Sequence, residues 1–349
     1  MSLLERKPTY LLQTRTGLVK RYQTELANRI YIPHKDYVRK IRNNLQFMKG
    51  INEKILLNGL SNTLYELSLL GAEVSVSKDI LKVKILDYVR KFSVGTDLYE
   101  LKVKLDFVLR GLVYGFEVLP EDGTPLTSKY VLLGDSQVKL YNGIKFEYLA
   151  SDAWIITETF FLDIHSKFDY GNKVVLDIGA AFGDTALFYA KQGASKILAV
   201  EPVNAELLNE NLRINPEFAG KVRVLEFAAG SDGEINLPKN VSNYFDGNAG
   251  LPGHSFMSVK VKGKTIRRII QDEGLSHVDI LKADCKGCER LFTADDLKLI
   301  EEGVEIECTF NPRSLLSLLS GQKFKIELMH YDPTDKRSFL QGGMIIARR

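Results

Sequence analysis

The sequence has few cysteines, little net charge and no long hydrophobic run. Three cysteines in 349 residues are too few for a disulfide framework, which favours an intracellular, cytoplasmic protein. No apolar stretch approaches the ~20 residues that a membrane-spanning helix needs, so we expect no span. The N-terminal MSLLERKPTY lacks the apolar core of a secretory signal. The net charge of +3 does not by itself indicate nucleic acid binding.

Positive charge is concentrated near the N-terminus. Residues 1–60 carry twelve Lys and Arg against four Asp and Glu, so the remainder of the chain is net acidic. Such a region can bind a polyanion, including nucleic acid, but a solvated helical surface often has the same composition. Both interpretations stay open at this point.

The first 111 residues predict a mainly helical N-terminal domain. Apolar residues recur at helical spacing, and Asn52 and Ser77 are suitable helix N-caps. The predicted helices cover approximately 37–48, 55–70, 80–92 and 98–109.

Residues 112–150 change to short runs with strand character. Asn142-Gly143 is a strong two-residue hairpin signal between two of these runs. We therefore predict a small antiparallel β connector here. A helix over 152–168 follows, with His165 expected on the surface at its end.

Residues 151–349 predict an α/β domain with a parallel, doubly wound sheet, because strands and helices alternate. The domain is organised around KVVLDIGAAFGDTALFYAKQGASKILAVE, residues 173–201. This segment predicts a strand, a glycine-rich turn, a helix and a second strand that ends on Glu201. The glycines let the backbone approach a nucleoside, and the terminal carboxylate can accept ribose hydroxyls.

The turn favours a cationic nucleoside ligand. It does not follow the G-x-G-x-x-G pattern, and no Walker lysine comes after it. Asp177 and Asp184 flank it and would repel a pyrophosphate bound at the helix N-terminus. S-adenosylmethionine carries an ammonium and a sulfonium, and it fits better.

Residues 174–204, VVLDIGAAFGDTALFYAKQGASKILAVEPVN, resemble the cofactor motif of class I S-adenosylmethionine-dependent methyltransferases. Together with VDILKADCKGCERLF, TIRRIIQDEGLSHVDILKAD and the terminal GGMIIARR, they resemble the FkbM family over approximately 155–349. The resemblance implies a Rossmann-like, seven-stranded sheet and methylation of a sugar-type or other hydroxyl. The chain departs from the family at Ala181, where Asn is common, and at Lys286, where Glu is common.

The resemblance also implies a set of cofactor-binding residues. Glu201 would hold the ribose hydroxyls, and Ala228 and Ala229 would lie along the adenine. The remaining residues expected to bind the cofactor are Asp177, Gly179, Ala180, Phe182, Gly183, Asp184, Thr185 and Pro202.

Four residues are candidates for acid–base chemistry. Asp284 is the first, because it follows the predicted central strand and should lie beside the cofactor. His254 lies in the Gly-, Asn- and Ser-rich segment 238–258, a candidate substrate loop in which it could equally be a solvated histidine. Glu289 and Glu307 complete the set.

Cys285-Lys286-Gly287-Cys288 is an isolated C-x-x-C segment, and Cys308 should end the adjacent strand. A zinc site would need a fourth ligand that the sequence does not identify, so we predict no metal. A disulfide and ordinary family-motif residues are the other two alternatives.

The function predicted from the sequence is O-methylation of a hydroxyl on a small-molecule, glycan or lipid-linked acceptor. A nucleic acid methyltransferase that uses the basic N-terminal region is an alternative, although the chain lacks an N/D-P-P-Y/F motif. A non-catalytic, cofactor-binding assembly protein is a second alternative. The sequence does not indicate an oligomeric state.

Overall fold

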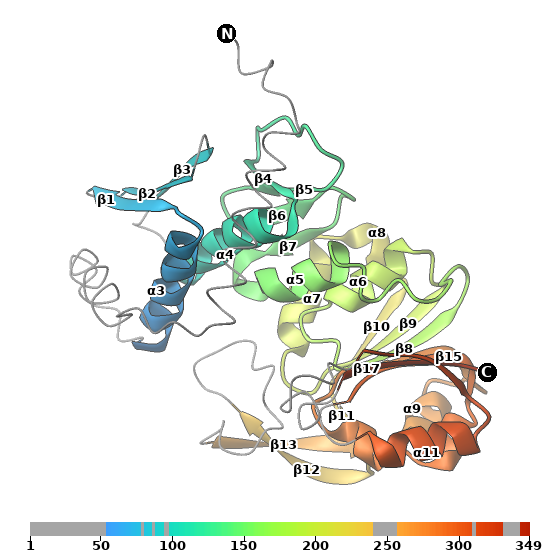
Figure 1. The fold of residues 1–349 in the computed structure, drawn as a ribbon. Helices are drawn as coiled ribbons and strands as arrows, with labels where there is room; N and C mark the ends of the chain where they lie inside the picture. The colour runs from blue at the N-terminus through green and yellow to red at the C-terminus, as the bar shows by residue number, and fades with distance from the viewer. Residues whose placement is uncertain are drawn as a thin grey trace. The chain divides into compact units, whose positions relative to one another are not determined.

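The computed structural model describes residues 54–77, 80–85, 88–93, 98–239, 257–308, 312–330 and 343–349. The chain divides into two compact units, Met1–Thr157 and Glu158–Arg349, whose elements are labelled in Figure 1. His254, most of the basic N-terminal region and the helix predicted over 37–48 lie outside the described residues.

The first unit contains two of the predicted helices. Helix α3 (Lys54–Leu69) packs against α4 (Leu98–Tyr114), and both bury regularly spaced leucines, among them Leu64 and Leu105. Helix α4 continues past Gly111, where the sequence predicted its end. A Cβ at that position would lie 2.6 Å from Val118 Cγ2, so the glycine allows close packing inside the helix.

The helix predicted over 80–92 is wrong. The segment forms an antiparallel sheet of β1 (Glu73–Ser77), β2 (Ile80–Ile85) and β3 (Tyr88–Ser93). Leu81 and Val83 are buried while Lys84 is exposed, which is strand alternation. The β-branched and alternating ILKVKI run favours a strand over the helical spacing that the same apolar residues also satisfy.

The predicted β connector forms a four-stranded sheet in the order β4-β5-β6-β7. Its hairpin at Gly143 is confirmed, but β4 and β5 are parallel rather than antiparallel. The segment between them carries the chain back to the start of β4, where Glu117 N–H donates to Lys129 O. The strands are β4 (Glu117–Pro120), β5 (Tyr130–Leu133), β6 (Gln137–Leu140) and β7 (Lys145–Glu147), followed by η2 (Tyr148–Ala150) and α5 (Ala153–Phe160).

The second unit is built on a seven-stranded mixed sheet, which confirms the predicted α/β class. The strand order is β10-β9-β8-β14-β15-β17-β16, and β17 is antiparallel to both of its neighbours. The strands are β8 (Val174–Ile178), β9 (Lys196–Val200), β10 (Val222–Leu225), β14 (Val278–Ala283), β15 (Ile300–Cys308), β16 (Lys325–His330) and β17 (Gly343–Arg348). The chain order reverses between β8 and β14, which is where open α/β sheets bind ligands at the strands' carboxyl ends.

Helices lie on both faces of this sheet (Figure 1). One face carries α6 (Asp184–Lys191), α7 (Ala205–Arg213) and α8 (Pro216–Ala219). The other carries α9 (Ile266–Asp272), α10 (Ala294–Leu297) and α11 (Arg313–Gly321). A smaller sheet, in the order β11-β13-β12, consists of β11 (Ala228–Ala229), β12 (Gly233–Lys239) and β13 (Met257–Lys264), and η3 (Cys288–Leu291) follows β14.

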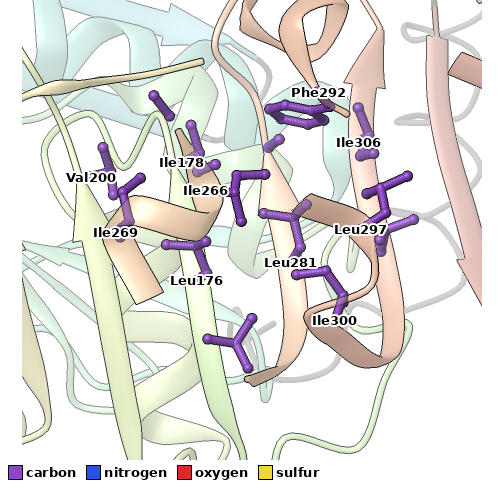
Figure 2. Close-up of a cluster of buried hydrophobic side chains, with 14 of the residues drawn as sticks. Leu176, Ile178, Val200, Ile266, Ile269, Leu281, Phe292, Leu297, Ile300 and Ile306 are labelled. Carbon is purple, nitrogen blue, oxygen red and sulfur yellow. The ribbon is translucent and has the colours of Figure 1, made fainter. Parts of the chain in front are cut away.

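The main core fills the space between the sheet and α9, α10 and α11 (Figure 2). Alternate strand residues such as Leu176, Ile178 and Leu281 point into it and are fully buried. The residues between them, including Asp177 and Lys282, therefore belong to the opposite face of the sheet.

Shortening a central core side chain should destabilise the second unit. We expect Leu281→Ala to lower the free energy of unfolding by about 2–5 kcal/mol. The shorter side chain would leave a cavity among close-packed neighbours. The matched control is Leu291→Ala, at a side chain that is 48% exposed, which should change stability by less than about 0.5 kcal/mol. Thermal denaturation measures both, and equal shifts would contradict this description of the core.

Candidate active site

A buried lysine joins the two central strands. Lys282 on β14 is the register partner of Asp177 on β8, and its Nζ lies 3.0 Å from Asp177 Oδ1. The same ammonium donates to Gly179 O at 2.9 Å, and Thr185 Oγ1 donates to Asp177 Oδ2 at 2.6 Å. Burial opposes the charge of Lys282, but Asp177, Asp284 and Asp184 outweigh it and raise the pKa of this lysine.

The glycine turn is held by both neighbouring strands. Gly179 N–H donates to Val200 O at 2.9 Å, and Asp284 N–H donates to Ile178 O at 2.9 Å. Gly179 has a φ of +75°, and a Cβ there would lie 1.9 Å from Asp284 O. Only glycine therefore fits between β8 and the segment that follows β14.

Asp184, at the start of α6, is buried and accepts a hydrogen bond from Thr159 Oγ1 at 2.6 Å. Burial raises the pKa of Asp184 to about 6, against the opposing effects of Lys282 and Thr159. Neither aspartate of the turn presents an exposed negative charge. Both side chains are buried, and Asp177 is paired with Lys282. The repulsion of a pyrophosphate that we expected from the sequence is therefore weakened by charge compensation inside the protein.

Glu201 lies at the carboxyl end of β9 and is 6% exposed. Its Oε2 accepts from Ala181 N–H at 3.0 Å, and its Oε1 accepts from the N–H groups of Val203 and Asn204, both at 2.9 Å. Burial raises the pKa of Glu201, while these three backbone donors oppose the shift. The carboxylate thus ties the glycine turn to the start of α7. Because Oε2 accepts one bond here, it can accept another from a ligand hydroxyl.

The other predicted cofactor residues differ in their surroundings. Ala180 and Phe182 are fully buried, and Gly183 has a φ of +92° directly before α6. Pro202 is half-buried beside Glu201. Ala228 and Ala229 form β11, which pairs with β13 of the small sheet rather than with the main sheet.

A cluster of three carboxyl groups and one ammonium lies at the carboxyl ends of β14 and β15. Lys286 Nζ is 2.8 Å from Asp284 Oδ1 and 2.7 Å from Glu307 Oε1. Burial raises the pKa of Glu307 to about 7 together with the charge of Asp284. Glu158 on α5 belongs to the same group of acids: burial and the negative charges of Glu307 and Asp284 raise its pKa to about 7. We call these four residues the carboxylate cluster.

Asp284 behaves differently from the other two acids of the carboxylate cluster. Burial favours its neutral form, but the ammonium groups of Lys286 and Lys282 lower its pKa to about 2. The structure therefore brings two of the predicted acid–base candidates, Asp284 and Glu307, to one lysine.

Cys285 and Cys288 form a disulfide, which decides among the alternatives left open by the C-x-x-C segment. Glu289 is buried and accepts from Gly287 N–H at 2.8 Å, so this candidate supports the loop. Cys308 is buried and lies outside the disulfide.

The expectation that His165 lies on the surface is wrong. Its ring is buried, and Nδ1 pairs with Glu305 Oε1, which is fully buried on β15. Burial opposes protonation, but Glu305 outweighs it and raises the pKa of His165. The helix predicted over 152–168 ends at Phe160, so the chain after it can turn back and place this side chain against the sheet.

Sequence reasoning missed Lys282, Glu305 and Glu158. The first two carried a signal, because each interrupts an apolar strand at a position that faces away from the main core. Aligning the predicted strands would have put Lys282 beside Asp177. No local signal distinguishes Glu158 from any other helical glutamate.

Residues 177–320 match the family model described as "Methyltransferase FkbM domain". Histone-arginine methyltransferase CARMER of Aedes aegypti is 36% identical over 89 residues, which are 25% of this chain and 14% of that protein. CARMER of Culex quinquefasciatus gives the same identity and coverage. The chain thus spans 14% of the length of these curated relatives.

Two solved structures have distant similarity. Fibrillarin of Aeropyrum pernix, with bound S-adenosyl-L-methionine, has a TM-score of 0.34 and 12% identity, and the match covers 79% of this chain and 97% of that chain. Magnesium protoporphyrin IX methyltransferase of Synechocystis PCC 6803 has a TM-score of 0.31 and 9% identity, over 56% and 78% of the two chains. Both similarities are too distant to bear on function.

The glycine turn can be tested by adding one methyl group. We expect Gly179→Ala to cost more than about 3 kcal/mol, because it combines a left-handed backbone with a clash against Asp284 O. Gly274 has a similar φ of +68°, but a Cβ added there would meet no atom within 4 Å, so Gly274→Ala should cost about 1 kcal/mol. Denaturant unfolding distinguishes the two, and equal losses would show that the close approach is unimportant.

The pair between His165 and Glu305 makes a pH-dependent prediction. The raised pKa of His165 means that the pair stabilises the fold below the ordinary histidine pKa of about 6.5 and loses this contribution as pH rises through the folded value. Glu305→Gln should therefore lower the free energy of unfolding by about 3 kcal/mol at acidic pH and by less at pH 9.

The matched control for this prediction is Glu301→Gln on the same strand. Glu301 pairs with His277 at 3.4 Å, but its side chain is 55% exposed. It should change stability little at either pH. An effect of Glu305→Gln that does not depend on pH would contradict the pairing.

Proposed function

Residues 177–320 form a methyltransferase FkbM domain, and from this premise we propose that the chain transfers the methyl group of S-adenosylmethionine to a hydroxyl acceptor. The family match confirms the resemblance and the methyltransferase class predicted from the sequence. The observation that supports the proposal most is the hydrogen bond from Ala181 N–H of the glycine turn to Glu201. The turn follows β8, where the chain order of the sheet reverses.

The residues around the turn fit S-adenosylmethionine, which supplies an electrophilic methyl group on sulfur. Glu201 is oriented by three backbone N–H groups and keeps acceptor capacity on Oε2 for one ribose hydroxyl. Gly179 and Gly183 adopt left-handed backbone conformations between β8 and α6, with φ of +75° and +92°. Lys282 balances the negative charge of Asp177 beneath the turn. The site therefore presents backbone groups and the Glu201 carboxylate, and not an unpaired aspartate. Ala228 and Ala229 remain our proposal for the adenine side.

A hydroxyl acceptor is consistent with the carboxylate cluster, because a hydroxyl loses a proton when it is methylated and a carboxylate can accept it. Sugar-type, small-molecule and lipid-linked hydroxyls share this chemistry. Nucleic acid remains the alternative, through the basic N-terminal region. The partial similarity to the CARMER proteins adds arginine side chains as an acceptor to test. The non-catalytic alternative predicts cofactor binding without transfer.

No helix within the described residues is long and apolar enough to cross a membrane. The cytoplasmic location remains a prediction. A disulfide is unusual in that compartment unless it is transient, catalytic or redox-sensing.

Removing the carboxylate of Glu201 should weaken cofactor binding. We expect Glu201→Ala to raise the Kd for S-adenosylmethionine by at least about 10-fold, because a hydrogen bond to a charged acceptor is lost. Glu206→Ala is the matched control, since Glu206 is exposed in the first turn of α7 and should leave the Kd unchanged. Isothermal calorimetry on the full chain measures both. Equal affinities for Glu201→Ala and the unmodified chain would refute the assignment.

The acceptor class can be found with methyl-tritiated S-adenosylmethionine and separate glycan, lipid, RNA and arginine-rich protein fractions. Label in the glycan or lipid fraction supports the proposal. Label in RNA that is lost when residues 1–53 are removed supports the nucleic acid alternative, and label in the arginine-rich protein argues against a hydroxyl acceptor. Cofactor binding without transfer to any fraction favours the assembly protein.

A further inference from the structure

We propose that the disulfide between Cys285 and Cys288 is a reversible thiol–disulfide exchange site, and that its reduction weakens the binding of S-adenosylmethionine. The second part of this inference rests on the proposed methyltransferase function. The inference gives a chemical role to the C-x-x-C segment, which the proposed function does not use.

The disulfide lies where a reductant can reach it. Cys285 and Cys288 are both partly exposed, whereas Cys308, the third cysteine of the chain, is 2% exposed. Access of the attacking thiolate to a sulfur is one of the factors that set the rate of exchange. The disulfide closes a ring of only four residues, so it restricts the unfolded chain less than a disulfide across a long loop would. We therefore expect it to open while the chain stays folded.

The surroundings of the disulfide offer a partner to its reduced form. Cys285 Sγ lies 3.6 Å from Oε2 of the buried Glu289, so a thiol on Cys285 can donate a hydrogen bond to this carboxyl group. The same oxygen accepts from Gly287 N–H at 2.8 Å. A disulfide has no hydrogen to donate, and Glu289 therefore favours the reduced form.

The segment around the disulfide borders three parts of the candidate site. The carbonyl of Asp284, directly before it, lies against the glycine turn, where a Cβ on Gly179 would be 1.9 Å away. Lys286, inside the ring, has its Nζ 2.8 Å from Asp284 Oδ1 in the carboxylate cluster. Leu291 ends η3, and a Cβ on Gly230 would lie 2.7 Å from its Cδ1. Gly230 directly follows β11, which we propose for the adenine side.

The disulfide restrains the backbone between the two cysteines. Lys286 has a φ of +52° and Gly287 a φ of +135°, and a lysine keeps a left-handed conformation only where the surrounding structure enforces it. The closed ring supplies this restraint, and reduction removes it. The contacts of the candidate site described above belong to the oxidised state. We therefore expect the oxidised state to bind the cofactor more tightly.

The exchange is balanced by two thiols of a reductant such as glutathione. One thiolate attacks a sulfur of the disulfide, which breaks the S–S bond, forms a mixed disulfide and releases the other cysteine as a thiolate. A second thiolate then attacks the sulfur of the reductant in the mixed disulfide and releases the remaining cysteine. Two electrons pass from the reductant, which becomes a disulfide, and two protons bind to Cys285 and Cys288.

The first test measures thiol exchange in the full chain without cofactor, by alkylation and mass spectrometry after equilibration with reduced and oxidised glutathione. EDTA is included, because Cys285, Cys288 and Glu289 place ligand atoms within 4.8 Å of one another and the reduced thiols would otherwise compete for metal ions. We expect Cys285 and Cys288 to become alkylated together and reversibly, while Cys308 stays protected. Alkylation of all three at once, or a disulfide that persists in excess reduced glutathione, overturns the proposal.

The second test determines whether reduction reaches the candidate site, again without cofactor. Amide hydrogen exchange should become at least about 5-fold faster on reduction in peptides that cover the glycine turn (179–183) and η3. The matched control is β10, at the edge of the sheet, where the rate should not change. Unchanged exchange at the glycine turn overturns the proposal.

The third test measures the Kd for S-adenosylmethionine by isothermal calorimetry with the full chain in each state. Reduction should raise the Kd by at least about 5-fold. The double variant Cys285→Ser, Cys288→Ser should bind as weakly as the reduced chain under both conditions, and Cys308→Ala should keep the redox response. Equal affinities of the oxidised and reduced chain overturn the proposal. If neither state binds the cofactor, the proposed function fails instead, and the first two tests still decide the role of the disulfide.

Discussion

The ion pair between Lys282 and Asp177 is the interaction on which the candidate site depends. It belongs to a row of charged residues across three neighbouring strands, because the sheet register places Lys282 between Asp177 and Glu305. An unpaired charge in this position would cost several kcal/mol, because these side chains are buried. The row extends to His165, which pairs with Glu305. Each charge is tolerated because its neighbour compensates it, so these residues have to be considered together.

This compensation leaves no unpaired negative charge on Asp177 in a turn that is rich in aspartate. Buried ion pairs contribute little net stability compared with well-packed apolar residues. Their value here is positional: Lys282 also binds Gly179 O, which fixes the first residue of the turn. Gly179 in turn lies against the carbonyl of Asp284. The position of Asp284 is therefore coupled through backbone contacts to the lysine beneath the turn.

The sequence allowed the second unit to be predicted better than the first. Strand–helix alternation and the glycine turn identified the sheet, because buried parallel strands form continuous apolar runs with polar residues at their ends. The segment ILKVKI was assigned wrongly because its apolar residues satisfy helical spacing as well as the strand alternation that the structure adopts. At the site, Asp177 and Glu201 were found from local motifs. The pairing of His165 with Glu305 was not, since it joins residues 140 positions apart and depends on where the chain turns after α5.

Lys286 shows what a departure from a family pattern can mean physically. The FkbM pattern often has a glutamate at this position, and a fourth carboxyl group there would add to the negative charge of the carboxylate cluster. A lysine instead forms two close ion pairs, one with Asp284 at the end of β14 and one with Glu307 on β15. Replacing one acid by a base therefore changes the charge balance of the carboxylate cluster. The sequence position identified the departure, and only the contact with Glu307 on the neighbouring strand gives it a chemical consequence.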